Sequence, residues 1–256
     1  MIYITGDTHG NFIRLHEDSF YEQKEMTKDD YLIICGDFGG VWAQDEHPGE
    51  KMELDWLESL PFTTLFVDGN HENFDRLNNQ YPVMDWNGGK VHVIRPSVLH
   101  LMRGEVFEID GTKIFAFGGA SSHDIQDGIL DPTDFCDEYD FRRTYNEWWN
   151  SGKMFRVKGL SWWPEELPNE EEMQNGLRNL EKHDWKVDFV ITHSPSASTL
   201  TLLGANGLYE QDVLTRYLEE IRVKLDYKRW IAGHMHINKQ INANDILMYE
   251  QIVRIA

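Results

Sequence analysis

Side chains that can bind metal ions follow five short apolar runs of this 256-residue sequence. They are Asp7 and His9, then Asp37, then Asn70 with His71 beside it, then His193, and last His234 and His236. Without His71, the set offers mixed oxygen and nitrogen ligands and no sulfur, which suits Mn²⁺, Fe²⁺ or Zn²⁺ better than Ca²⁺. Seven ligands are too many for one tetrahedral ion. If Asp37 bridges, two ions can each take four protein ligands, as in hydrolytic sites whose ions lie about 3.5 to 4 Å apart.

The five preceding runs have the composition of buried strands that end in loops. They are residues 2–5, 31–35, 64–67, 189–192 and 229–232, which are rich in β-branched and aromatic residues and too short for helices. Loops at the carboxyl ends of parallel strands meet in one crevice of an α/β sheet. Residues far apart in the sequence are therefore expected to form one polar cluster.

Helical spacing between and after these runs completes an α/β pattern. Residues 12–20 and 56–60 repeat apolar side chains at helical spacing after the first and second runs, which predicts βαβα alternation. Later in the chain, Asn169 and Glu172 predict a helix that begins with a capping box, and residues 213–221 predict another helix.

The middle and the end of the chain are predicted to be antiparallel. Asp110-Gly111 joins two apolar runs, which is typical of a tight hairpin, and residues 246–255 can close a second sheet. Residues 120–186 are predicted to form an insertion or lid. The tryptophans of this segment are expected to pack in its interior rather than to line a cleft; they are Trp148, Trp149, Trp162 and Trp163.

Composition and charge limit the classes of function. With 41% hydrophobic residues the chain can bury a substantial core. Its 24 basic and 44 acidic residues give a net charge of −20, which repels polyanions, so we expect no extended nucleic acid as a partner. No apolar run approaches the roughly 18 residues of a membrane helix, and the first residues do not have the pattern of an export signal. We therefore expect no membrane partner and a cytoplasmic location.

Five motifs together resemble those of the calcineurin-like metallophosphoesterases. In order, they are Gly6-Asp7-Thr8-His9-Gly10, Gly36-Asp37, Gly69-Asn70-His71-Glu72, Thr192-His193 and Gly233-His234-Met235-His236. Any one of them is weak, but five in the right order and spacing are specific and extend over nearly the whole chain. The resemblance implies a single domain over residues 1–256: an α/β fold with a two-sheet sandwich of mixed parallel and antiparallel strands, flanked by helices.

The resemblance also implies a role for each candidate residue. One ion would be held by Asp7, His9, Asp37 and His236, and the second by Asp37, Asn70, His193 and His234. The ions would be Mn²⁺, Fe²⁺ or Zn²⁺, with Mn²⁺ expected in vitro. His71 would be the catalytic acid that donates a proton to the leaving group. The glycines before the ligands, Gly6, Gly36, Gly69 and Gly233, would allow sharp turns where a Cβ would crowd the site.

One part of the second motif departs from the family pattern. Many relatives continue Gly-Asp with a second aspartate, and the protein phosphatase branch adds a phosphate-binding arginine, whereas this chain has Gly40 and Val41. The missing carboxylate would orient the catalytic imidazole. Asp75, Asp124 and Arg76 are the candidates to compensate, and the sequence does not distinguish among them.

Hydrolysis of a small phosphomonoester or phosphodiester is the expected reaction, by attack of a hydroxide shared between the two ions. The alternatives are a metal-binding or interaction scaffold without turnover, a metal-dependent nuclease, and a protein phosphatase, which the missing arginine disfavours. Motifs for an NTPase loop, a zinc protease helix and a serine nucleophile elbow do not occur in the sequence. The natural substrate and the oligomeric state stay open.

Overall fold

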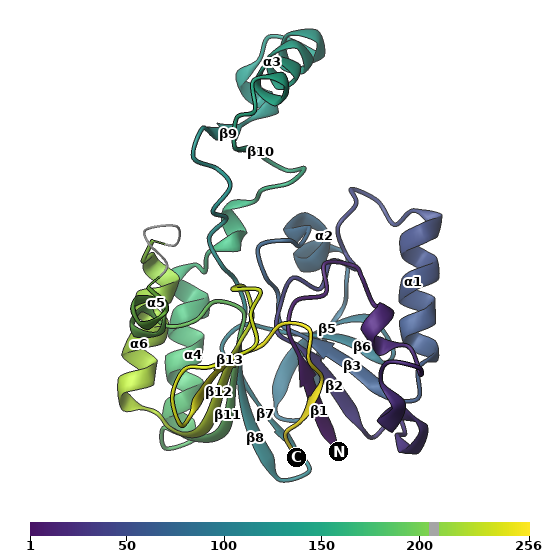
Figure 1. The fold of residues 1–256 in the computed structure, drawn as a ribbon, viewed down its shortest axis with the longest axis vertical. Helices are drawn as coiled ribbons and strands as arrows, with labels where there is room; N and C mark the ends of the chain where they lie inside the picture. Colours follow the sequence, from purple (N-terminus) through teal and green to yellow (C-terminus); the bar gives the residue numbers. More distant parts are fainter. Residues whose placement is uncertain (205–209) are drawn as a thin grey trace.

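Two mixed β-sheets pack face to face between layers of helices in the computed structural model, which describes residues 1–204 and 210–256 (Figure 1). The first sheet has the strand order β15-β1-β2-β3-β6-β5-β4 and the second β13-β14-β12-β11-β8-β7. Strands β9 and β10 form a separate pair. The predicted α/β sandwich with mixed strand directions and flanking helices is confirmed.

The strands are short. Those of the first sheet are β1 (Ile2–Thr5), β2 (Tyr31–Ile34), β3 (Thr63–Phe66), β4 (Val83–Trp86), β5 (Gly89–Arg95), β6 (Val98–Leu101) and β15 (Val253–Arg254). Those of the second are β7 (Glu105–Ile109), β8 (Thr112–Phe117), β11 (Lys186–Thr192), β12 (Asp226–Ala232), β13 (Lys239–Gln240) and β14 (Asp245–Leu247). The separate pair is β9 (Gly128–Leu130) and β10 (Phe155–Val157).

Helices cover the outer faces of both sheets. The α-helices are α1 (Pro48–Ser59), α2 (Phe74–Asn79), α3 (Glu138–Asn150), α4 (Glu170–Lys182), α5 (Ala197–Leu203) and α6 (Val213–Lys224). Four 3-10 turns are η1 (Ile13–Leu15), η2 (Tyr21–Glu25), η3 (Pro132–Asp134) and η4 (Pro164–Glu166). Figure 1 shows α1 and α2 beside the first sheet and α4, α5 and α6 beside the second. Among the helices described, none combines the length and the apolar character that a membrane crossing requires.

Burial on both faces explains why the central strands are continuously apolar. In β1, Ile2 and Ile4 belong to the core between the two sheets, whereas Tyr3 belongs to the core under the helices of the first sheet. Successive side chains of a strand point to opposite faces, so a strand in the middle of four layers has no polar face. All five predicted strands are present.

The helix predicted after β1 is wrong. Residues 12–20 form the 3-10 turn η1 and a loop, and η2 follows. Phe12, Leu15 and Phe20 are buried as expected, but two tight turns achieve this instead of a helix. The side chain of Gln23 donates to the carbonyl oxygens of Leu15 and Phe20, which a helix would have used internally.

The predicted antiparallel character of the second half is only partly right. The Asp110-Gly111 hairpin between β7 and β8 is present, with positive φ at both residues. However, β8, β11, β12 and β14 are mutually parallel, because helices connect several of these strands. Residues 246–255 do not stay in one sheet: β14 joins the second, and β15 pairs antiparallel with β1 of the first.

A segment between β8 and α4 extends away from the sandwich. Figure 1 shows β9, α3 and β10 above the two sheets, with α4 back beside the second sheet. Helix α4 begins with the predicted capping box of Asn169 and Glu172, and its Leu180 is fully buried against the second sheet. The expectation of buried tryptophans holds for Trp163, which is 2% exposed, and is wrong for Trp149 on α3, which is 68% exposed.

Because α4 is packed on the core and α3 is exposed, side-chain truncations on these two helices should lower the free energy of unfolding by different amounts. Leu180→Ala removes buried contacts of the second core and should lower the free energy of unfolding by about 2 to 5 kcal/mol. Trp149→Ala alters an exposed side chain of α3 and should change it by less than about 0.5 kcal/mol. Urea denaturation monitored by far-UV circular dichroism measures both. Equal destabilisation would mean that α3 contributes to the core as α4 does.

Candidate metal centre

The predicted ligands lie together where strands of both sheets end. Asp7, Asp37 and Asn70 follow β1, β2 and β3 of the first sheet. His193 follows β11, and His234 and His236 follow β12 of the second. The parallel direction of these strands brings all their carboxyl ends to one edge of the sandwich.

Four of these residues form a first cluster. Possible ligand atoms of Asp7, His9, Asp37 and His236 lie within 4.8 Å of one another. The Nε2 atoms of His9 and His236 are 3.0 Å apart, and His236 Nε2 lies 3.2 Å from Asp7 Oδ2. Two ring nitrogens that face each other and two carboxylates are the arrangement expected of converging ligands.

A second cluster shares Asp37 with the first. Ligand atoms of Asp37, His193 and His234 also lie within 4.8 Å of one another. Asp37 Oδ2 is 3.6 Å from His9 Nε2 of the first cluster and 3.4 Å from His193 Nε2 of the second. The Nδ1–H of His193 donates to the carbonyl oxygen of Cys35 at 2.7 Å, which turns Nε2 toward Asp37. One carboxylate thus faces both groups of nitrogen atoms.

Two buried atoms among the predicted ligands of the second ion make no hydrogen bond to the residues described, although one of them faces Asp37 Oδ2 across the 3.4 Å ion pair. They are His193 Nε2 and Asn70 Oδ1. Both residues are almost fully buried, at 0% and 1% exposure, where a polar atom without a partner costs free energy. Asn70 Nδ2 donates to Ser122 Oγ at 3.3 Å, which leaves the side-chain oxygen without a hydrogen-bond partner among the described residues. A cation would satisfy both atoms, and the set of donors fits a divalent ion of borderline softness.

Backbone strain is concentrated at the same residues. His9, Asp37, His234 and His236 have φ angles of 48°, 44°, 63° and 48°. Non-glycine residues seldom adopt positive φ, and such strain typically persists at functional sites where the surroundings enforce it. Close approach also requires two of the predicted glycines: a Cβ at Gly69 would lie 2.1 Å from Asp37 Oδ1, and one at Gly233 would lie 2.2 Å from Asp7 Oδ1.

The surroundings shift the pKa values of two of the histidines in opposite directions. Burial lowers the pKa of His193, but the nearby carboxylates of Asp37 and Asp7 outweigh it and raise that pKa to about 10. Burial lowers the pKa of His234 well below its usual value. Against its burial, the neighbouring histidines hold the pKa of Asp37 well below its usual range. The metal-free cluster therefore keeps the aspartate charged and places a proton on His193.

His71 lies at the rim of the two clusters. Its backbone N–H donates to Asp37 Oδ1 at 2.8 Å, and its ring packs between those of His9 and Trp42. Arg156 Nη2 is 2.9 Å from His71 Nε2. Burial, together with the charge of Arg156, lowers the pKa of His71 to about 4, although Asp37 opposes the shift.

Two of the three predicted substitutes for the missing carboxylate are wrong. Asp75 accepts a hydrogen bond from Trp163 Nε1, and Arg76 forms a buried ion pair with Glu50. Asp124 reaches His71 only indirectly, because its Oδ1 pairs with Arg156 Nε at 2.7 Å. Among the described residues, the side chain that forms a hydrogen bond with the imidazole is that of Arg156.

The sequence contains no local signal for Arg156, Ser122 and Glu166, which complete the surroundings of the clusters. Ser122 Oγ donates to Glu166 Oε2 at 2.7 Å and contacts Asn70, while Glu166 Oε1 lies 3.5 Å from Arg156. Burial raises the pKa of Glu166 to about 8. Ser122 lies in a loop, Arg156 on β10 and Glu166 on η4, and only the tertiary fold brings the three together.

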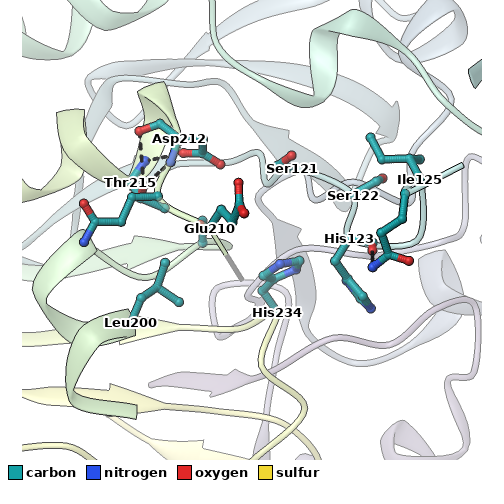
Figure 2. A pocket seen from close by; sticks show the side chains of 12 residues that line it. Ser121, Ser122, His123, Ile125, Leu200, Glu210, Asp212, Thr215 and His234 are labelled. Atoms are coloured by element: carbon teal, nitrogen blue, oxygen red, sulfur yellow. Dashed lines mark hydrogen bonds between the residues drawn. The ribbon is translucent and has the colours of Figure 1, made fainter. Parts of the chain in front are cut away.

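A cavity of about 370 Å³ opens beside His234. Figure 2 shows His234 at its floor, with Ser121, Ser122 and His123 on one side and Leu200, Glu210, Asp212 and Thr215 on the other. No lysine or arginine stands among the described residues that line it. The cavity can accept part of a substrate, but it offers no cation to an additional phosphate there.

Lariat debranching enzymes are among the known proteins to which the chain is similar. Lariat debranching enzyme A of Xenopus laevis is 24% identical over 255 residues, which cover 92% of this chain and 42% of the relative. The lariat debranching enzyme of Caenorhabditis briggsae is 25% identical over 258 residues, which cover 92% and 46%. The chain therefore spans less than half the length of these curated relatives.

A solved structure, phosphopantetheinyl hydrolase from Mycobacterium tuberculosis, aligns with a TM-score of 0.43 and 16% identity, over 97% of this chain and 87% of that one. The sequence model of the family described as calcineurin-like phosphoesterase matches residues 1–238, a range that includes every candidate ligand. The resemblance identified from the five motifs is confirmed, and the chain belongs to the calcineurin-like phosphoesterase family.

Proposed function

We propose that this chain hydrolyses phosphoesters with two divalent metal ions. Asp7, His9, Asp37 and His236 would hold one ion, and Asp37, Asn70, His193 and His234 the other. The observation that carries the proposal is the single buried carboxylate of Asp37 facing His9 on one side and His193 on the other. Bound ions would act as Lewis acids toward phosphoryl oxygens and would lower the pKa of a water molecule to a value near neutral pH.

The chain's own residues would orient the ester and assist departure of its leaving group. Asp7 and Asp37 fix the ligand set, since Asp7 accepts the backbone N–H of His234 and Asp37 that of His71. His71, at the rim, is the catalytic residue in this proposal and donates to the leaving oxygen. A donor placed at that oxygen contributes about 10² to 10⁴ in rate when the leaving group is basic.

A small substrate fits the charge of the chain. The net charge of −20 opposes a long polyanion. On the protruding helix α3, Arg142 and Arg143 are engaged by Glu138 and Asp140 of the same helix, so these arginines do not form a basic surface. A monoester or diester with one compact arm would suit the cavity beside His234.

Debranching is a second candidate, favoured by the similarity to lariat debranching enzymes over 92% of this chain. A lariat is a looped chain closed at a branch, and cleavage at one branch needs no extended contact with the rest of the chain. Since the chain spans less than half of those relatives, their activity is transferred here only as a hypothesis.

Turnover of model esters tests the proposal. Metal-free protein should hydrolyse neither p-nitrophenyl phosphate nor bis(p-nitrophenyl) phosphate, and added Mn²⁺ should restore turnover of at least one. A short branched oligonucleotide and its linear counterpart distinguish the two candidates, because debranching predicts cleavage of the branched one alone. No turnover of any of these with Mn²⁺, Fe²⁺ or Zn²⁺ would favour a scaffold without catalysis.

Replacing the shared carboxylate should affect both ions. Asp37→Asn removes the negative charge common to the two clusters, so bound metal should fall below that of the wild type and the rate should drop by more than about 100-fold. Metal content by inductively coupled plasma mass spectrometry and the initial rate measure this. Asp85→Asn, at an exposed position of β4, is the matched control. Full metal content in Asp37→Asn would exclude the bridging role.

Metal binding should release protons. His193 has a pKa of about 10 in the metal-free protein, so at neutral pH its proton must leave before Nε2 can bind an ion. Affinity for Mn²⁺ should therefore rise with pH, by about tenfold per unit for each proton released. Calorimetry in two buffers with different ionisation enthalpies counts the protons. Binding without proton release would show that His193 is neutral beforehand.

Loss of the catalytic imidazole should depend on the leaving group. His71→Asn should slow esters with basic alkoxide leaving groups by about 10² to 10⁴, and p-nitrophenyl esters by less than about tenfold, because p-nitrophenolate needs little assistance. His16→Asn, an exposed histidine on η1's C-terminal side, is the control and should change neither rate. Equal slowing of both ester classes would remove this role from His71.

A further inference from the structure

Within residues 1–204 and 210–256, Arg156 supplies the guanidinium that contacts the candidate catalytic residue His71. It lies on β10 of the protruding segment, yet it is only 5% exposed, because β10 brings it down to the edge of the metal-ligand clusters. Its Nη1 donates to the carbonyl oxygens of Asn70 and Ser161 at 3.2 and 3.1 Å. Its Nη2 is 2.9 Å from His71 Nε2.

The direction of the hydrogen bond to His71 follows from chemistry alone. A guanidinium has five N–H donors and no acceptor, and it keeps its charge at every accessible pH. His71 Nε2 must therefore accept, and it can accept only when it carries no proton. The neutral ring then has its single N–H on Nδ1.

The surroundings hold both partners in this geometry. Asp124 Oδ1 pairs with Arg156 Nε at 2.7 Å, so that donors on three nitrogens of the guanidinium are directed at fixed acceptors. The His71 ring lies 4.9 Å from the ring of His9 and 5.6 Å from that of Trp42, measured between centroids, which restricts its rotation. These contacts keep Arg156 as the donor and His71 Nε2 as the acceptor of the hydrogen bond between them.

We propose that Arg156 is a positioning residue that holds the imidazole of His71 with Nε2 as the hydrogen-bond acceptor, so that Nδ1–H is the donor left for the leaving group. This inference rests on the proposed function of His71. A carboxylate partner, which this chain lacks after Asp37, would stabilise an imidazolium, and a guanidinium does the opposite. Neutral imidazole acts as such a donor in triosephosphate isomerase, where it polarises a carbonyl group.

The step balances without an imidazolium. A hydroxide from water forms the new bond to phosphorus while the bond to the leaving oxygen breaks. The electron pair of the broken bond goes to the leaving oxygen, which accepts a hydrogen bond from Nδ1–H and takes a proton from solvent water, so that hydroxide is regenerated. His71 ends the step in the tautomer in which it began. Arg156 gains and loses no proton, and its contribution is to keep Nδ1 protonated before each turnover.

Nitrogen NMR of the metal-free protein reads the tautomer directly. In protein labelled with ¹⁵N-histidine, the signals of His71 are identified by their loss in His71→Asn. The wild type should show an unprotonated Nε2 and a protonated Nδ1 at neutral pH. Arg156→Met removes the donor and should shift His71 to a mixture of tautomers, whereas Arg156→Lys retains a donor and should restore the wild-type pattern in part. Lys158→Met, two residues along and paired with Asp131 within the protruding segment, should change nothing.

Steady-state kinetics of the metal-loaded enzyme gives an independent readout. Arg156→Met should lower kcat for alkyl esters by at least about tenfold more than for p-nitrophenyl esters, while KM changes little, because Arg156 acts through His71. A rise in KM alone would instead make Arg156 a substrate-binding residue and overturn the proposal. A protonated Nε2 in the wild type would also overturn it, and this result is read on the wild-type protein, with His71→Asn needed only to assign the signals. Absence of any hydrolysis would refute the proposed function while leaving the tautomer result to stand by itself.

Discussion

The buried carboxylate of Asp37 is the interaction on which the site depends. It lies 1% exposed between histidines of both sheets, with one oxygen committed to the backbone of His71 and the other facing His9 and His193. Asp7 is buried beside it, and two buried carboxylates require positive charge nearby, because burial of an uncompensated charge is very costly. In the metal-free chain the proton on His193 supplies part of it. Metal ions would replace that proton with a larger charge and would satisfy Asn70 Oδ1 as well.

The arrangement of the two sheets brings the residues of this cluster together. Each sheet contributes strands whose carboxyl ends reach the same edge, so that Asp37 of the first sheet can meet His193 of the second. The turns after these strands are too sharp for relaxed backbone, which is why His9, Asp37, His234 and His236 have positive φ. Packing of the core on both faces of the strands is what sustains this strain. Stability in the sheets and strain in the loops are thus two parts of one arrangement.

Those features could be predicted because they are recorded locally in the sequence. Short apolar runs that end at Asp, Asn or His predicted the strands and the cluster, and the Asp110-Gly111 pair predicted the hairpin. Where spacing alone was the guide, the prediction was weaker: residues 12–20 have helical spacing but form 3-10 turns stabilised by Gln23. The division of residues 246–255 between two sheets and the arrival of Arg156 beside His71 depend on contacts between distant segments. The local sequence around these residues contains no pattern that predicts either feature.

The contact between Arg156 and His71 also joins two parts of the molecule that differ in packing. Arg156 belongs to a strand of the protruding segment, whose helix α3 has no buried residue, whereas Asn70 and His71 follow a central strand of the first sheet. Arg156 pairs with Asp124 at 2.7 Å and, at the longer distance of 3.5 Å, with Glu166, whose pKa is raised by burial to about 8. Displacement of the protruding segment would therefore draw a cation away from His71 and from the backbone of the ligand Asn70 together. The protruding segment thus meets the site through Arg156, beside His71, and through Ser122, beside Asn70, even though the chain as a whole is strongly acidic.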